Sequence, residues 1–206
     1  MSTVSTVLKG VRYDLRNYSD IDFDSDLMIH YLNRAIKTLD YTLGGNNSDQ
    51  TLNKGTAILS AAATTADVPT GCFTIREVWI DEDRKKNLDI MEIYYKQEYR
   101  ESGTAEPNFW AHSGDTIKVE VTADQDYTLT VYYDKLSTEL TAESDTMPYG
   151  GKYDDAMREA VVVLCEAKKY KQPAEADIAY LRIFENIIKM DIVNRAFIKK
   201  TYRLDF

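Results

Sequence analysis

Histidine and cysteine are scarce in this chain of 206 residues, which has two of each. His30, His112, Cys72 and Cys165 include no closely spaced pair of the kind that zinc sites use. The two cysteines also lie far apart in sequence, which favours buried apolar roles over a disulfide framework. The sequence therefore predicts no metal and no cofactor, and it gives no support to a cysteine–histidine nucleophile.

Long apolar runs and an excess of positive charge are also missing. No apolar stretch approaches the 18 residues that a membrane-spanning helix needs, so we expect no membrane association. The first seven residues have no basic region followed by a long apolar run, so we expect no secretory signal. The net charge of -9 argues against non-specific binding to duplex DNA, which depends on lysine and arginine. What remains is an acidic, tyrosine-rich globular chain, long enough for one sizeable core.

Helical periodicity occurs near both ends of the chain, whereas the middle is rich in short β-type segments. The apolar spacing predicts helices over residues 4–16, 26–43, 152–171 and 175–198. Alternating or β-branched segments predict strands over residues 56–63, 72–80, 118–122 and 127–133. Residues 89–100 mix the two periods, as a strand that passes into a short helix would.

The order of these segments predicts an α+β fold in a single domain over residues 1–206. We expect a four-helix bundle built from both chain ends, residues 1–48 and 149–206. A β-rich insertion, residues 49–148, would lie between the two parts of this helical core. Because no long helices separate the strands, an antiparallel sheet is favoured over a parallel one.

Charge is unevenly distributed along the sequence. The expected β-rich insertion has 9 basic and 19 acidic residues, a net charge of -10, whereas residues 1–48 have -1 and residues 149–206 have +2. The last twelve residues are basic and aromatic, which is typical either of a docking peptide or of a solvated chain end. The candidate docking residues are Arg195, Lys199, Lys200, Tyr202, Arg203 and Phe206.

Aromatic side chains gather in or beside the β-rich insertion. An ordinary aromatic core would account for them, but half of a simple sheet faces water, so some rings can cover a partner surface. The candidates for partner binding are Tyr94, Tyr95, Tyr99, Phe109 and Trp110.

The segment Asp20–Asp26 imitates the start of a calcium-binding loop. Such a loop needs glycine at position six and glutamate at position twelve, and both possible registers fail this requirement. Acidic residues beside a helix N-terminus explain the segment better. A carboxylate pair for glycoside hydrolysis stays open as an alternative, but no pair can be selected among 34 acidic residues.

The order of segments resembles the head-to-tail adaptor, or connector, proteins of short-tailed bacteriophages. The resemblance covers most of the chain, although Thr122–Asp126 replaces a turn that is often proline-rich in that family. The motifs that carry it are Leu32–Ile36, Val68–Val78, Glu106–Trp110, Gly114–Val119, Tyr127–Tyr133, Leu140–Tyr149 and Tyr153–Ala156.

This resemblance implies a virion structural protein of the tail or neck region, made in the host cytoplasm, and not an enzyme. It implies a ring, typically of twelve copies, that binds the portal on one surface and tail or neck proteins on the opposite one. DNA would pass through the ring without sequence-specific binding. The alternatives are another neck, head-completion or tail assembly protein, or a carboxylate-based hydrolase of cell-wall glycan.

Overall fold

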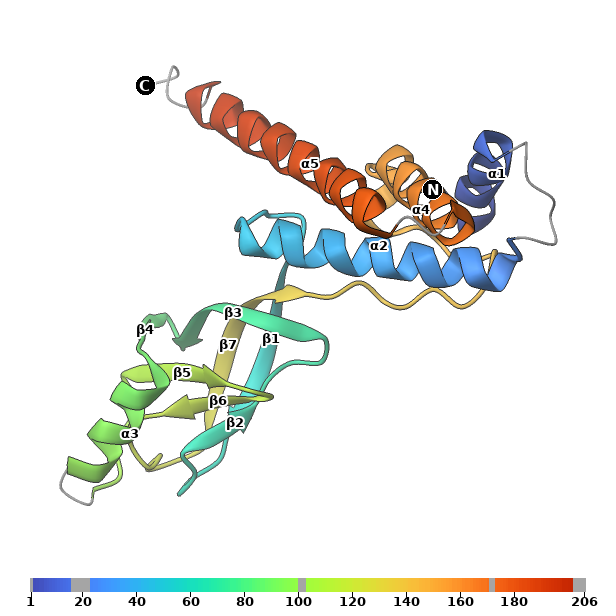
Figure 1. The fold of residues 1–206 in the computed structure, drawn as a ribbon. Coiled ribbons are helices and arrows are strands. Elements are labelled where there is room, and N and C mark those ends of the chain that lie inside the picture. The colour runs from blue at the N-terminus through green and yellow to red at the C-terminus, as the bar shows by residue number, and fades with distance from the viewer. Residues whose placement is uncertain (1, 16–22, 100–102, 171–172, 202–206) are drawn as a thin grey trace. The chain divides into compact units, whose positions relative to one another are not determined.

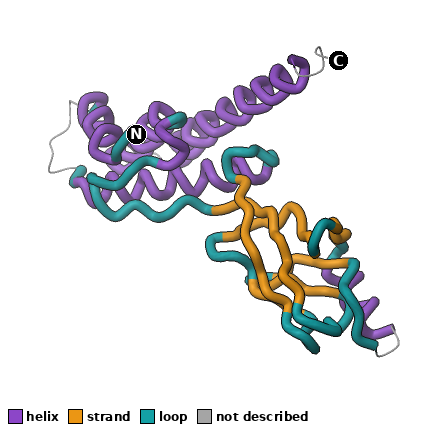
Figure 2. Tube along the Cα trace, turned by 180° about the vertical axis from the view of Figure 1, so that it is seen from behind, coloured by secondary structure: helices purple, strands orange, loops and turns teal. Residues whose placement is uncertain are grey.

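Helices form from both ends of the chain and strands from its middle in the computed structural model, as Figures 1 and 2 show. The structure describes residues 2–15, 23–99, 103–170 and 173–201. It divides into two compact units. We call residues 1–50 with 137–206 the helical unit, and residues 51–136 the barrel unit.

The helical unit is built around helix α4. Its helices are α1 (Val4–Asp14), α2 (Ser25–Gly45), α4 (Asp154–Tyr170) and α5 (Pro173–Thr201), with a short 3-10 turn, η1, at Pro148–Gly151. Helix α4 contacts α1, α2 and α5. Each packs through the apolar stripe that its sequence spacing creates, so Leu8, Leu32, Met157 and Phe184 share one core.

The expected four-helix bundle built from both chain ends is wrong. Helix α1 has 11 residues and α5 has 29, so at 1.5 Å per residue they span about 17 and 44 Å. Helices of such different length cannot share one core along their whole length. The fifth helix, α3 (Ile90–Tyr99), belongs to the barrel unit.

The barrel unit contains a seven-stranded sheet that nearly closes into a barrel. Its strands are β1 (Leu52–Leu59), β2 (Thr65–Asp67), β3 (Cys72–Ile80), β4 (Asp83–Asn87), β5 (Phe109–Ser113), β6 (Thr116–Val119) and β7 (Tyr127–Lys135). They follow the order β1-β7-β3-β4-β5-β6-β2, and the two end strands, β1 and β2, contact each other. The pair β4 and β5 is parallel, so the sheet is mixed and the expected antiparallel arrangement holds only for the other pairings among the described residues.

Alternation along β7, from Tyr127 to Tyr133, explains how the sheet faces its core. Leu129 and Val131 are buried, while Thr128 lies on the exposed side. The inward residues of β7 pack beside those of β3, and the two strands pair in register at Val78 and Val131. This alternation is what a sheet with one packed face requires.

A buried ion pair joins strands β3 and β7 of the barrel unit and also binds the residue that precedes β1. Arg76 on β3 donates to both carboxylate oxygens of Asp134 on β7, at 2.9 and 2.5 Å. The hydroxyl of Thr51 donates to the same carboxylate at 2.5 Å. At this point the two ends of the unit meet, because the N–H of Lys135, the residue before its last, donates to the carbonyl of its first residue, Thr51, at 3.0 Å.

Candidate functional site

Helix α3 is fixed on the barrel unit by a capping box and two anchors. The Met91 N–H donates to the Asp89 carboxylate at 2.8 Å, and the Asp89 N–H donates to Glu92 at 3.3 Å. Ile93 is fully buried, and the Gln97 amide donates to the Val119 carbonyl at 2.7 Å. These contacts attach one face of α3 and leave the opposite face outside.

The outer face of α3 is aromatic and exposed. Met91 is 69% exposed and Tyr95 is 64% exposed, and Tyr94, 46% exposed, lies on the same face three residues after Met91. The Lys118 ammonium lies 3.9 Å from the centre of the Tyr94 ring, close enough for a cation–π interaction. Because large exposed apolar side chains that cluster on one helix indicate a binding surface, this α3 face is a candidate interaction site.

The aromatic residues that the sequence analysis selected are placed differently from one another. Tyr94 and Tyr95 are exposed, and Phe109 is half-buried with the Lys96 ammonium 4.6 Å from its ring centre. Trp110 is only 1% exposed, and its indole N–H donates to the Lys85 carbonyl at 3.1 Å, so it lies in the core. The side chain of Tyr99 lies outside the described part of the structure.

The basic C-terminal candidates fall mostly beyond what the structure describes. Arg195, Lys199 and Lys200 lie in helix α5, but their side chains are outside the described set. Tyr202, Arg203 and Phe206 lie outside the described residues altogether.

A second outward surface lies on strands β7, β3 and β4, and the sequence did not predict it. The indole of Trp79 donates to Glu77 at 3.0 Å, and Arg84 pairs with Glu77 at the same distance. The Trp79 and Tyr132 rings meet edge to face with centres 6.5 Å apart. The period-two alternation of β3 is the signal that places Glu77 and Trp79 on one face.

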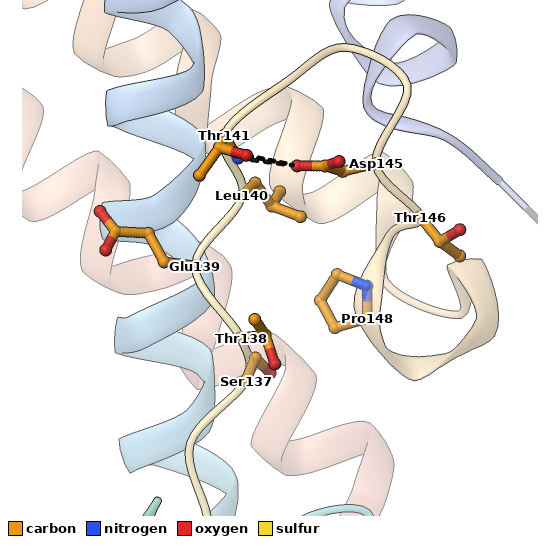
Figure 3. Close-up of a pocket in the computed structure, with 8 residues that line it drawn as sticks. All are labelled: Ser137, Thr138, Glu139, Leu140, Thr141, Asp145, Thr146 and Pro148. Atoms are coloured by element: carbon orange, nitrogen blue, oxygen red, sulfur yellow. Dashed lines mark hydrogen bonds between the residues drawn. The ribbon is translucent and has the colours of Figure 1, made fainter.

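Residues Ser137–Met147, which we call the strap, line a pocket in the helical unit. The pocket has a volume of about 490 Å³ and is lined by strap residues and Pro148. Figure 3 shows Asp145 facing Thr141 across it; the Asp145 carboxylate accepts the Thr141 and Ala142 N–H groups at 2.7 and 2.9 Å. These two N–H groups lower the pKa of Asp145 from its ordinary value.

Polar side chains of α1 and α2 anchor the strap. The Asn33 amide both donates to the Leu140 carbonyl, at 2.8 Å, and accepts the Leu140 N–H, at 2.9 Å. The buried Asp40 carboxylate accepts the Ser137 N–H at 2.7 Å and the Tyr149 hydroxyl. Burial raises the pKa of Asp40 despite these bonds, which favour its ionised form.

Glu143 attaches the second half of the strap to α1 and α2. Its carboxylate accepts the Ser25 hydroxyl at 2.5 Å and the Arg12 guanidinium at 3.1 Å. The Ser25 hydrogen bond, followed by Arg12, lowers the pKa of Glu143. The strap pocket is therefore held by a structural hydrogen-bond network, and its lining offers no activated nucleophile or acid–base pair among the described residues.

The cysteines and acidic clusters of the described residues are also unsuited to catalysis or metal binding. Burial raises the pKa of Cys72 to about 11 and that of Cys165 to about 12, which leaves both as thiols near neutral pH. Among those residues, no group of histidine, cysteine and carboxylate side chains could hold a metal ion. Asp24, from the calcium-like segment, instead caps α2 by accepting the Leu27 N–H at 2.8 Å.

None of the described helices combines the length and the apolar character that crossing a membrane requires.

Comparison with known proteins gives one family. The model of the SU10 adaptor protein family matches residues 2–199, which is nearly the whole chain and includes both units. No curated protein matches the chain.

Proposed function

Because the chain belongs to the SU10 adaptor protein family, a phage head-to-tail adaptor family, we propose that its copies form a ring beneath the portal. Such a ring connects the capsid to the tail and forms part of the channel through which DNA passes. The match over residues 2–199 carries this proposal. It identifies the chain as a phage adaptor and a virion component, and the family as one of structural proteins.

Charge in the barrel unit supports a role beside the DNA channel. Residues 51–136 contain 9 basic and 15 acidic side chains, a net charge of -6. An acidic wall repels the phosphate backbone and does not release the counterions that tight DNA binding depends on. DNA would therefore pass such a surface without sequence-specific contacts.

Two surfaces of the chain are suited to different partners. The basic, aromatic C-terminal residues, including Lys199 and Lys200, are our candidate for docking on the portal. The aromatic α3 face, with Tyr94 and Tyr95, is our candidate for a tail or neck protein, because exposed tyrosine and methionine are enriched at protein interfaces.

Light scattering with negative-stain imaging tests the proposal, on the protein alone and mixed with the purified portal of the same phage. We expect rings with a central hole in at least one sample, since a portal template can lower the entropic cost of association. A chain that stays monomeric and does not bind the portal would contradict the proposal.

A further inference from the structure

Helix α5 has apolar side chains on two faces, and the described part of the helical unit covers only one of them. Tyr180, Phe184 and Ile187 face the core. On another face, Ile178 is 56% exposed and Leu181 is 54% exposed. A helix that is apolar on two sides normally packs on two sides.

Four apolar residues of α5 form a ridge at coiled-coil spacing, whereas Met190 and Val193, which are also exposed, lie outside it. The ridge consists of Ile178, Leu181, Ile188 and Ile192; Ile188 is half-buried, and the other three are exposed. With residue 185, these positions follow the alternating three- and four-residue spacing that keeps a seam on one side of a helix. This regular seam distinguishes the ridge from scattered exposed apolar residues.

Two basic side chains border the ridge. Arg182 and Lys189 are exposed, seven residues apart, and form no ion pair with any residue that the structure describes. Seven residues make nearly two helical turns, so the two cations lie along one edge about 10.5 Å apart. Glu185, within the seam, precedes Lys189 by four residues, a spacing at which the two attract.

Helix α4 has an acidic stripe with the same spacing. Glu159 and Glu166 are exposed and also seven residues apart, with the half-buried Val162 between them. Asp155, one turn earlier, is already paired with Arg158 at 3.6 Å, so Glu159 and Glu166 carry the charge of the stripe. The α4 stripe and the α5 ridge lie on neighbouring helices of one unit and present opposite charges at matching intervals.

We propose that the α5 ridge of one copy packs against the acidic stripe of α4 in a second copy. Arg182 and Lys189 then face Glu159 and Glu166 of that copy, and Val162 packs against the ridge. Because the two complementary surfaces are on different helices, each copy offers one to each neighbour. Contacts of this head-to-tail kind close into rings, so the inference rests on the ring of the proposed function and identifies its subunit interface.

Charge reversal tests the interface in the full-length chain. The first variant combines Arg182→Glu with Lys189→Glu, and the second combines Glu159→Lys with Glu166→Lys. Each variant alone should associate at least about tenfold more weakly than wild type, because like charges then meet at both pairs. Circular dichroism checks that each variant keeps its helix content. The control variant combines Lys9→Glu with Lys37→Glu, which reverses two exposed positive charges elsewhere in the helical unit.

Mixing the two variants is the decisive step. In the mixture, each reversed surface meets a reversed partner and each unchanged surface meets an unchanged one, so assembly should return in alternating rings. Ultracentrifugation with and without portal measures it. If each variant alone assembles as well as wild type, or if the mixture stays dissociated, this interface is wrong, while the proposed ring still holds. A wild-type chain that never associates would overturn the ring and the interface together.

Discussion

Asp40 is a buried anchor of the strap. Its buried carboxylate accepts two hydrogen bonds from Ser137 and one from Tyr149. The change Asp40→Asn places an amide N–H group where these donors converge, so we expect a loss of about 2 kcal/mol in the free energy of unfolding. Chemical denaturation measures this loss. The exposed Asp49→Asn should change stability by less than about 0.5 kcal/mol, and equal effects would contradict the prediction.

Asp145 gives the strap a dependence on pH. Its pKa is lowered from the ordinary value of 3.8, so the carboxylate stabilises the fold above that value and loses this effect as pH falls through its native pKa. The stability difference between wild type and Asp145→Asn should therefore be largest near pH 6 and shrink toward pH 3. Thermal unfolding across this range measures the difference. A difference that grows on acidification would have the wrong sign.

At the scale of elements, α3 is attached to the barrel unit mainly through one apolar side chain. Ile93 is fully buried, so Ile93→Ala should lower the stability of this unit by about 3 kcal/mol. Met91→Ala, on the exposed face, should change it by less than about 0.5 kcal/mol. Both tryptophans, Trp79 and Trp110, are in this unit, so their fluorescence during urea unfolding reports the change. Similar midpoints for the two variants would refute this attachment.

Elements with strong periodicity were predictable from the sequence, and weakly apolar ones were not. The strand expected at 72–80 is β3, Cys72–Ile80, and the helix expected at 26–43 is α2, Ser25–Gly45. Strand β4 reads Asp-Arg-Lys-Lys-Asn, and its four exposed positions hide it from a hydrophobic pattern. Strand β4 is stabilised by its pairing with β3 and β5. Pairing with a distant residue leaves no signal in the local sequence.

At the scale of the whole molecule, portal docking should depend on the basic C-terminal residues. The pair Lys199→Glu and Lys200→Glu reverses two of these charges, so portal binding should weaken by about tenfold if they face an acidic portal surface. Interferometry on immobilised portal measures the affinity. Lys9→Glu with Lys37→Glu serves as the matched control. Unchanged binding of the Lys199 and Lys200 variant would remove the assignment.

Interaction surfaces were harder to foresee than the family. The order of motifs along the chain was enough for the resemblance, because a family pattern uses the sequence alone. Exposure, by contrast, depends on the fold: Tyr94 and Trp110 look equally suitable in the sequence, but one is exposed and the other is in the core. The anchoring of the strap by Asn33 joins residues that are 107 positions apart, which composition and spacing do not reveal.

The meeting of Thr51 and Lys135 has a consequence for the order of folding. When β1 and β7 pair, they bring the chain on either side of the barrel unit together. The two parts of the helical unit are separated by 86 residues of sequence. Once β1 and β7 have paired, only a short effective loop separates these parts, so bringing them together costs less conformational entropy. We therefore expect the sheet to form before the helices dock. Pulsed hydrogen exchange during refolding should show amides of β1 and β7 protected before those of α1 and α4.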